Sequence, residues 1–473
     1  MTAPHAQDAG AAPHTGQARG PRDTAASAAR DRDVRPSDTR PSDARPSDGG
    51  PLDARPSDGG PLDVIALDAG ALDVIAPDAD ALDVIAYYRD PVKAPLLRAV
   101  MLPLAADAAA EGLAAHLERH WLHGPHVRLR LQGPSGRVRA FAASAASRIR
   151  DRLREHPSRD DLTDAQLLAS AAESGRTELI APPYGPLVPD NTVRVAPVDR
   201  GPVRELLGDS GTALREDLLR AGLPALRAGA DFLGERGDAA PARLHLAVTA
   251  LAAHAAAHPD GLAGAHYSYV SHLEDFLVHE DPDGRLRAAF DRQWDRAGDA
   301  TTALVARLTE GTALGGERAW TAYCAEAWRL TRKRYEAGED LHGVPAAYRD
   351  RAAATGDLAA ATRWNPELRT RYSEFHRLLS SSDPHGTMWS RPDYLIHRAT
   401  TNALYRLLAL CDVRPLERYV AAHLVIRTVP DLTGCDWRTE VRAAADAART
   451  DAVRTGAAVR TEALRAVVAE GAA

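Results

Sequence analysis

The run HWLHGPHVRLRL occupies residues 120–131, and its second half alternates between polar and apolar residues. Alternation at period two is typical of a strand whose successive side chains point to opposite faces. The apolar face carries Val127, Leu129 and Leu131. The basic face carries His126, Arg128 and Arg130. Two interpretations stay open: an outer strand with a solvated basic face, or an anion clamp built on the donor forks of the arginines.

Two further segments read as strands. LDVIAYY at 82–88 is rich in β-branched and aromatic residues, and TVRVAPV at 192–198 alternates like an edge strand. Helical patterns fill 96–122, 146–156, most of 202–351, and two blocks near 394–427 and 438–470. We therefore expect an α+β protein in which a small, mostly antiparallel sheet packs with many helices.

The N-terminal part has low complexity. RPSD repeats give way to a ten-residue period in which Leu52, Leu62, Leu72 and Leu82 are each followed by Asp. The last copy opens the strand at 82–88, so the earlier copies look like tandem duplications of its start. Their Pro, Gly, Ser and Asp content favours disorder. We expect a disordered tail over 1–80 and one catalytic domain over 81–473.

Charge and composition exclude several classes of protein. Residues 1–84 hold fifteen Asp and eight Arg, which accounts for the whole net charge of −7, so the remainder is neutral. A neutral body gives no support for a direct nucleic-acid binder. The three cysteines have no CxxC spacing, and the sequence shows neither a secretory signal nor an apolar run of membrane length. We expect a cytoplasmic protein with no membrane contact.

The common cofactor motifs are missing from the sequence. There is no HExxH, GxSxG, GxxxxGK[ST] or GxGxxG after a strand. His116 and His120 are four apart and would share a helix face, but no ligand-type residue at a telling spacing accompanies them. We expect neither a metal nor an organic cofactor.

Two helical stretches carry chemistry-bearing side chains. HYSYVSHLEDF at 266–276 places Tyr269, Ser271 and His272 close together, either as acid–base groups or as part of a buried helix. The block at 397–424 combines an apolar stripe, typical of a core helix, with His397, Asn402 and Tyr405.

A strand ending in Tyr-Tyr, a helix, and a Gly-Pro-His-x-Arg-x-Arg strand together resemble the C-terminal elimination domain of lantibiotic dehydratases. They also resemble the stand-alone proteins of thiopeptide-type bacteriocin biosynthesis. The resemblance continues through YVSHLEDFL, FHRLL at 375–379 and TNALYRLLALCDVRPLERYVAAHL, and it covers most of 82–430. It implies an elimination-domain-like fold that acts on a precursor peptide, alongside partner dehydratase or azole-forming enzymes.

The family has two activities. In its elimination branch, basic strand residues and a later His remove glutamate from glutamylated Ser or Thr. Arg128 and Arg130 match the strand pair, and His397 matches the later His, although Asn402-Ala403 stands where the family has Asn-Arg. The family's Tyr-x-x-Glu-x-x-Arg-Tyr-Gly-Gly run is replaced here by APPYGPLVPDNTV.

The second branch closes two dehydroalanines into a pyridine-type ring and releases the leader peptide. The Asn-x-Leu-Tyr…Pro-x-x-Arg-Tyr…His-Leu block is similar to this branch, which we therefore place first, with glutamate elimination second and a non-catalytic leader-binding scaffold third. The catalytic candidates are His126, Arg128, Arg130, Ser271, His272 and His397. The substrate-binding candidates are Tyr184, Asn191, Tyr269, Asn402 and Tyr405.

Overall fold

The structure is a computed structural model and describes residues 80–159, 161–365, 367–383 and 385–451. The described chain contains a sheet of four strands: β1 (Ala81–Tyr87), β2 (Ala114–His120), β3 (His126–Gln132) and β4 (Val193–Pro197). The strands lie in the order β2-β3-β1-β4, and every neighbouring pair is antiparallel. The repeats and the tail predicted over 1–80 lie outside the described residues, except for Asp80.

Strand β3 lies inside the sheet, between β2 and β1. Protein covers both of its faces, and on the basic face His126 is 1% and Arg130 3% exposed. The interpretation of β3 as an outer strand with a solvated basic face is therefore wrong. By contrast, the edge strand predicted at 192–198 is confirmed, because β4 pairs only with β1 among the described strands.

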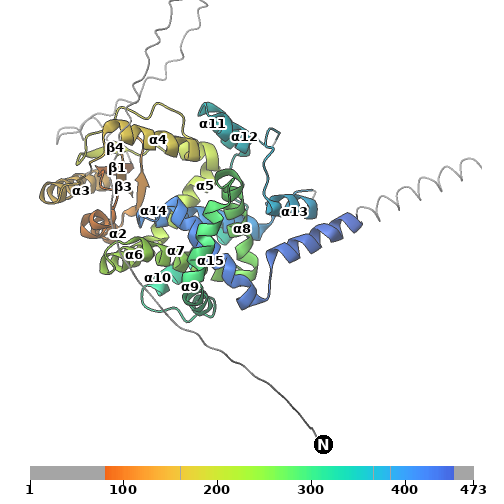
Figure 1. Cartoon of the computed structure of the whole chain (residues 1–473). Helices are drawn as coiled ribbons and strands as arrows, with labels where there is room; N and C mark the ends of the chain where they lie inside the picture. The colour runs from red at the N-terminus through yellow and green to blue at the C-terminus, as the bar shows by residue number, and fades with distance from the viewer. Residues whose placement is uncertain (1–79, 160, 366, 384, 452–473) are drawn as a thin grey trace, which may run out of the picture. The chain divides into compact units, whose positions relative to one another are not determined.

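Helix α3 (Ser135–Glu155) covers the apolar face of the sheet, as Figure 1 shows at the left of the view. Small and apolar residues recur along α3 at spacings of three and four, which places them on one side of the helix. These buried residues are Val138, Phe141, Ala142, Ala145, Ala146, Ile149 and Leu153. They pack towards the strand residues Val127, Leu129 and Leu131, which are all fully buried. This burial fixes the pairing, because a slip of one residue would turn the leucines of β3 to the opposite face.

The opposite face of the sheet carries polar side chains and meets two helices. Helices α5 (Gly201–Ala221) and α14 (Pro392–Leu410) both pack along β2. Figure 1 shows them on the side of the sheet away from α3. They bring Arg215, Glu216 and Arg406 to the polar face, so the chemistry of that face depends on residues far apart in the sequence.

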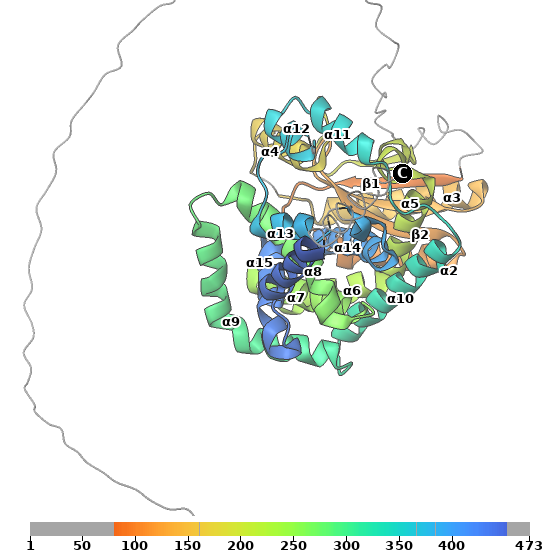
Figure 2. The ribbon, with the colours of Figure 1, turned by 90° about the vertical axis from the view of Figure 1, so that its right-hand side faces the viewer.

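The centre of the helical part is α7 (Ala240–Ala256), which packs against α8, α9, α10 and α15 (Figure 2). Its Ala and Leu side chains are buried around most of the helix, as expected for a central helix. The other described helices are α1 (Ala94–Leu96), the π-helical turn η2 (Leu97–Met101), α2 (Leu102–Ala110), α4 (Asp164–Glu178), α6 (Leu223–Glu235), α8 (Gly261–Glu280), α9 (Arg285–Thr309), α10 (Glu317–Glu336), α11 (Pro345–Ala354), α12 (Leu358–Trp364), α13 (Glu374–Ser382), the 3₁₀ turn η3 (Thr387–Ser390) and α15 (Pro415–Thr433). Residues 437–451 are also helical.

Strand β2 corrects the helix predicted over 96–122. Helix α2 ends at Ala110, and Gly112 then adopts a positive φ of 73°, after which the chain runs extended. His116 and His120 therefore lie on one face of a strand, not of a helix. Alanine-rich sequence favours helix, but pairing with β3 outweighs that preference here.

The helical block predicted near 394–427 is divided in two. Helix α14 ends at Leu410, Asp412 adopts a φ of 59°, and Pro415 begins α15. Proline is suited to the first turn of a helix and is unfavourable in the interior of one. The architecture as a whole confirms the α+β prediction. Within the described residues, no helix combines the length and apolar character needed to cross a membrane.

Candidate active site

Four cross-strand rows make up the polar face of the sheet, since paired residues on one face lie side by side, and three of these rows carry ionisable side chains. The first row holds His120, His126 and Tyr87; the second holds Glu118, Arg128, Ile85 and Arg194; the third holds His116, Arg130, Asp83 and Ala196. The rows differ in how many of their cations have a carboxylate partner. The candidate site lies where cations have none.

The third row is closed and internally neutralised. Arg130 donates to both carboxylate oxygens of Asp83 at 2.9 and 3.0 Å and to Glu216 of α5 at 3.3 Å. Burial is the largest influence on the pKa of Arg130 and would lower it, but hydrogen bonding to Asp83 and the charges of Asp83, Glu118 and Glu216 together raise that pKa. A guanidinium held in this way has few donors left for a substrate. Arg130 therefore joins strands and helix.

The second row carries cations that lack a carboxylate partner. The Nε of Arg128 donates to the Nε2 of His126 at 2.9 Å, and within the described chain Arg128 makes no salt bridge. Arg194 lies over the ring of Tyr87, 5.6 Å from its centroid. The Nε and Nη1 of Arg194 are buried without a hydrogen-bond partner in the described part of the chain. Buried donors of this kind are uncommon and call for a ligand or water.

Two helices add further positive charge beside this row. Arg215 of α5 donates from Nη2 to Glu118 at 2.9 Å, but its Nε and Nη1 have no partner among the described residues. The side chain of Arg406 on α14 is exposed, and repulsion by Arg215 lowers its pKa to about 10. We call Arg128, Arg194, Arg215 and Arg406 the arginine cluster. Its excess of positive charge suits it to bind an anion or a developing oxyanion.

The first row supplies neutral imidazoles next to the arginine cluster. The Nδ1–H of His126 donates to the carbonyl of Gly124 at 2.8 Å, so that its Nε2 is left to accept from Arg128. Burial, and then the charge of Arg128, hold the pKa of His126 well below its ordinary value. The same two causes lower the pKa of His120 to about 3. Both rings are therefore neutral at neutral pH.

Ser271 and His272 belong to a second group, at helix α8. The Ser271 hydroxyl lies 3.0 Å from Nε2 of His376 on α13, and Nδ1 of His376 lies 2.7 Å from the hydroxyl of Ser373. Burial lowers the pKa of His376, and the charge of Asp275 acts against this lowering. A neutral imidazole facing a hydroxyl can accept its proton.

His272 pairs with Tyr405 across α8 and α14. The phenol oxygen lies 3.4 Å from Nδ1 of His272. Burial lowers the pKa of His272 to about 4 and raises the pKa of Tyr405 to about 12, so both groups are neutral at neutral pH. Arg418 lies over the ring of Tyr405 at 4.9 Å and also repels Arg406, which links this pair to the arginine cluster.

His397 and Tyr269 lie deeper in the helical core. Their buried neighbour His254 contacts the hydroxyls of Tyr269 and Thr400, both at 2.9 Å. The His397 ring lies 4.3 Å from that of His254, and neither nitrogen of His397 has a partner in the described residues. Over the same residues, no group of three or more His, Cys, Asp or Glu side chains is arranged to hold a metal ion. Because Tyr269, His254 and His397 are all buried, they are set back from solvent.

The remaining predicted residues are dispersed. The hydroxyl of Tyr184 donates to the carbonyl of Ile180. The side-chain oxygen of Asn191 accepts from the backbone N–H of Ser158 at 2.7 Å, and its amide nitrogen donates to the carbonyl of Ser158. Both stabilise the irregular segment before β4. Asn402 is exposed on α14, one turn before Arg406. Of the substrate-binding candidates, Tyr405 adjoins Arg406 in the chain, whereas Asn191 and Asn402 lie three and four residues before Arg194 and Arg406.

Sequence reasoning missed several members of these groups. Arg194 stands on the polar side of the alternating TVRVAPV stretch, so its position was readable from the pattern. His376 lies in the quoted FHRLL run but had no neighbour in sequence to pair with. Arg215 and Arg406 sit on helices whose approach to the sheet depends on tertiary packing, and no local pattern indicates it.

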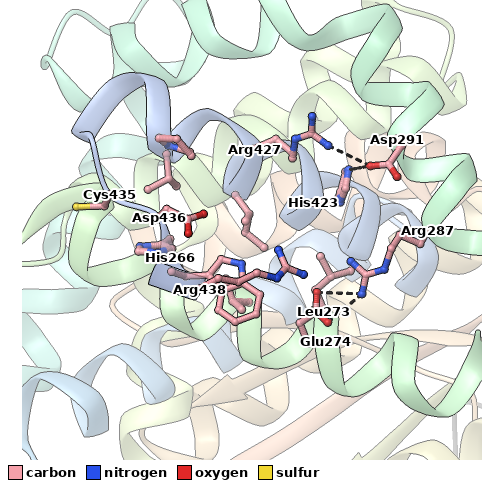
Figure 3. Close-up of a pocket in the computed structure, with 15 residues that line it drawn as sticks. His266, Leu273, Glu274, Arg287, Asp291, His423, Arg427, Cys435, Asp436 and Arg438 are labelled. Carbon is pink, nitrogen blue, oxygen red and sulfur yellow. Dashed lines mark hydrogen bonds and ion pairs between the residues drawn. The ribbon is translucent and has the colours of Figure 1, made fainter. Parts of the chain in front are cut away.

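A separate pocket of about 380 Å³ lies among α8, α9, α15 and residues 435–438 (Figure 3). Its charged groups largely pair with one another: Arg287 with Glu274, and Arg427 with Asp291. This internal pairing contrasts with the unpaired guanidiniums on the sheet. The arginine cluster is therefore the better candidate for a charged ligand.

Comparison with known proteins agrees with the architecture. The structure is similar to the pyridine synthase TbtD from thiomuracin biosynthesis, with a TM-score of 0.56 and 20% identity over 75% of this chain and 99% of that one. It is also similar to TsrL, with a TM-score of 0.49 and 17% identity over 77% of this chain and 98% of that one. No curated protein matches the chain in sequence. The model of the family described as lantibiotic biosynthesis dehydratase C-term matches residues 82–429, and the chain therefore belongs to that family.

Proposed function

We propose that this chain matures a ribosomally made thiopeptide by joining two dehydroalanines into a pyridine-type ring. One dehydroalanine and its neighbouring amide, as the iminol tautomer, act as the aza-diene, and the second dehydroalanine supplies the alkene. Loss of water and then of the leader peptide as its amide gives the aromatic ring, so no oxidant is required. Family membership supports a peptide substrate, and a solved pyridine synthase has the same fold.

The observation that carries the proposal is the arginine cluster beside the neutral ring of His126. Arg128 holds its Nε against His126, which leaves its terminal nitrogens to donate to the amide oxygen of the reacting peptide. Stabilising negative charge on that oxygen favours loss of the amide N–H proton to give the imidate, which becomes the iminol when its oxygen is protonated, and rigid donors do so without reorganisation. Holding both alkenes in place then makes the ring closure effectively intramolecular.

Proton transfers fall to the groups at α8. His272 with Tyr405, and Ser271 with His376, are neutral pairs that can exchange a proton with substrate at neutral pH. Buried His397 and Tyr269 support the helix positions from behind. In this scheme the chain acts after a dehydratase, because its substrate already contains two dehydroalanines, and azole-forming enzymes are expected to act on the same precursor.

Glutamate elimination is the second candidate, and the same cluster favours it. The unpaired guanidiniums of Arg128 and Arg194 would hold the carboxylate of a glutamyl ester, while a neutral histidine removes the Cα proton. The products would be free glutamate and a dehydroamino acid.

Mass spectrometry of two precursor peptides decides between the candidates. With a peptide carrying two dehydroalanines, ring closure predicts loss of water and release of the leader as a carboxamide. With a peptide carrying glutamylated serine, elimination predicts loss of glutamate. Binding of both peptides without any mass change would contradict both reactions and leave a leader-binding scaffold.

A further inference from the structure

Solvent reaches the middle of the polar face at two neighbouring side chains. Every residue of β1 is buried except Ile85, which is half-exposed. Within β3 the half-exposed residues are Arg128 and Gln132, and Gln132 ends the strand. Ile85 and Arg128 pair directly across the two strands, so their side chains lie side by side on the same face. A substrate that reaches the central strands therefore meets an aliphatic side chain next to a guanidinium.

Ile85 occupies a position where a carboxylate would neutralise the arginine cluster. In the third row, Asp83 of the same strand binds Arg130 with both of its oxygens. In the second row, Ile85 lies between Arg128 and Arg194. An aliphatic side chain accepts no hydrogen bond, so it leaves the donors of both guanidiniums available. One side chain of β1 thus contributes to the difference between the two rows.

The aza-diene of the proposed reaction has a polar and an apolar end. Its oxygen is the atom that Arg128 would bind, and its apolar end is the CH₂ group of the dehydroalanine. Both ends belong to one short planar unit, whose span is comparable with the distance of about 4.5–5.5 Å between cross-strand neighbours. On the β2 side Arg128 adjoins Glu118, which is buried and binds Arg215. On the β1 side it adjoins Ile85, which suits an apolar end group.

We propose that Ile85 is a specificity-determining residue of the candidate site. It contacts the CH₂ group of the aza-diene and selects dehydroalanine over dehydrobutyrine, which carries an additional methyl group at this carbon. The inference rests on the proposed ring closure. The pairing of β1 with β3 fixes the separation of Ile85 and Arg128, so an oxygen bound at Arg128 leaves little space for a larger group beside the branched side chain.

Two precursor peptides that differ by this methyl group test the inference in the full-length chain. Both supply dehydroalanine as the alkene, and the aza-diene is formed by dehydroalanine in one peptide and by dehydrobutyrine in the other. We expect the unmodified chain to close the dehydroalanine ring about 10–200-fold faster, the usual discrimination for one such carbon. Ile85→Ala should reduce this ratio by about tenfold, mainly by accelerating the dehydrobutyrine peptide. Single-turnover rates followed by mass spectrometry give the ratio.

Ile426→Ala is the matched control, because Ile426 is also a half-exposed isoleucine but belongs to α15. It should keep the ratio of the unmodified chain. Ile85→Val keeps the β-branched shape favoured in a strand and should give an intermediate ratio. If the unmodified chain closes the ring but its ratio is unchanged in Ile85→Ala, the inference is overturned and the proposed function stands. If the unmodified chain closes no ring, both are overturned.

A charged variant tests whether Ile85 keeps the guanidiniums available. In Ile85→Asp a carboxylate stands between Arg128 and Arg194, where it should pair with them as Asp83 pairs with Arg130. We expect a folded chain whose turnover of the dehydroalanine peptide is lowered by about 10²–10³-fold. Ile85→Asn has nearly the same shape without the charge and should keep more of the turnover. Unmodified turnover in Ile85→Asp would contradict the inference.

Discussion

Arg128 and Arg130 show how the surroundings of a residue decide its role. The two residues point to the same face of one strand, two positions apart, yet Arg130 contacts Asp83 and Glu216 whereas Arg128 contacts only the ring of His126 among its described neighbours. The sequence predicts that both arginines belong to an anion clamp, because alternation shows which face of the strand a residue lies on but not which residues it contacts. Two carboxylates separate them: Asp83 lies opposite Arg130 on β1, where Arg128 has Ile85, and Glu216 reaches Arg130 from α5.

Replacing Arg128 by Gln should reduce turnover of the precursor peptide by about 10²–10³-fold, the usual cost of one donor to a developing oxyanion. The fold should be kept, because Arg128 neutralises no carboxylate in the described structure. Arg154→Gln, on the exposed side of α3, is the control and should leave the rate unchanged. The measurement is the single-turnover rate with the thermal midpoint recorded in parallel. Equal rates for the two variants would remove Arg128 from the mechanism.

Replacing Arg130 by Gln should instead destabilise the fold by about 3–5 kcal/mol, because it leaves Asp83 buried without a cation, whereas Glu216 keeps Arg200. Urea unfolding measures this loss. Adding Asp83→Asn removes one stranded charge, so the double variant should be less destabilised than the sum of the two single changes. Additive losses would mean that the pair is not coupled.

At the scale of elements, the periodicity of the sequence predicted those strands and helices whose local preference agrees with their tertiary packing. Strands β1, β3 and β4 were readable because β-branched or alternating residues mark them. Strand β2 was not, because its sequence AAHLERH has no β-branched residue and its extended form depends on pairing with β3. The helices α14 and α15 were read as one block, since the apolar stripe continues through the turn at Asp412.

A carboxylate on α8 holds the segment that carries His376. Asp275 binds Arg363 at the end of α12 and Arg369 just before α13. Asp275→Asn should cost about 1–3 kcal/mol, the range for hydrogen bonds to charged groups, and should speed hydrogen exchange over residues 358–373. Asp291→Asn, which breaks ion pairs at α15, should leave that exchange unchanged. Unchanged protection of 358–373 in the Asp275 variant would contradict this anchoring.

At the scale of the whole molecule, the candidate site depends on contacts that no local pattern contains. Members of the arginine cluster come from β3, β4, α5 and α14, between residues 128 and 406. The sequence supplied Arg128 and, through resemblance, the blocks around His272 and His397. It could not show that Tyr269 and His397 are set back in the core, because a helical stripe looks the same whether its polar members face a ligand or other helices.

Buried neutral histidines make the whole fold sensitive to acid. Burial lowers the pKa of His120 and His254 to about 3 and that of His272 to about 4, against an ordinary 6.5. The unfolded chain therefore binds more protons than the folded one across this interval, so stability falls as pH drops below 6.5. Each group contributes at most about 1.4 kcal/mol per pH unit.

Urea unfolding midpoints measured over this interval should decrease steadily towards acid. His254→Gln removes one of the titrating rings and should reduce the slope, whatever its effect on stability at neutral pH. Stability that stays constant on acidification would show that these histidines are protonated as readily in the folded chain as in the unfolded one.

The central place of β1 also has a consequence for translation. This strand leaves the ribosome before either strand that flanks it, and 106 positions separate its last residue, Tyr87, from the first residue of β4. At about 5–20 residues per second the nascent strand waits roughly 5–20 s for that neighbour. Its leucine and valine remain unshielded for this time, so slower elongation should lower the yield of folded protein and a chaperone that binds apolar segments should restore it.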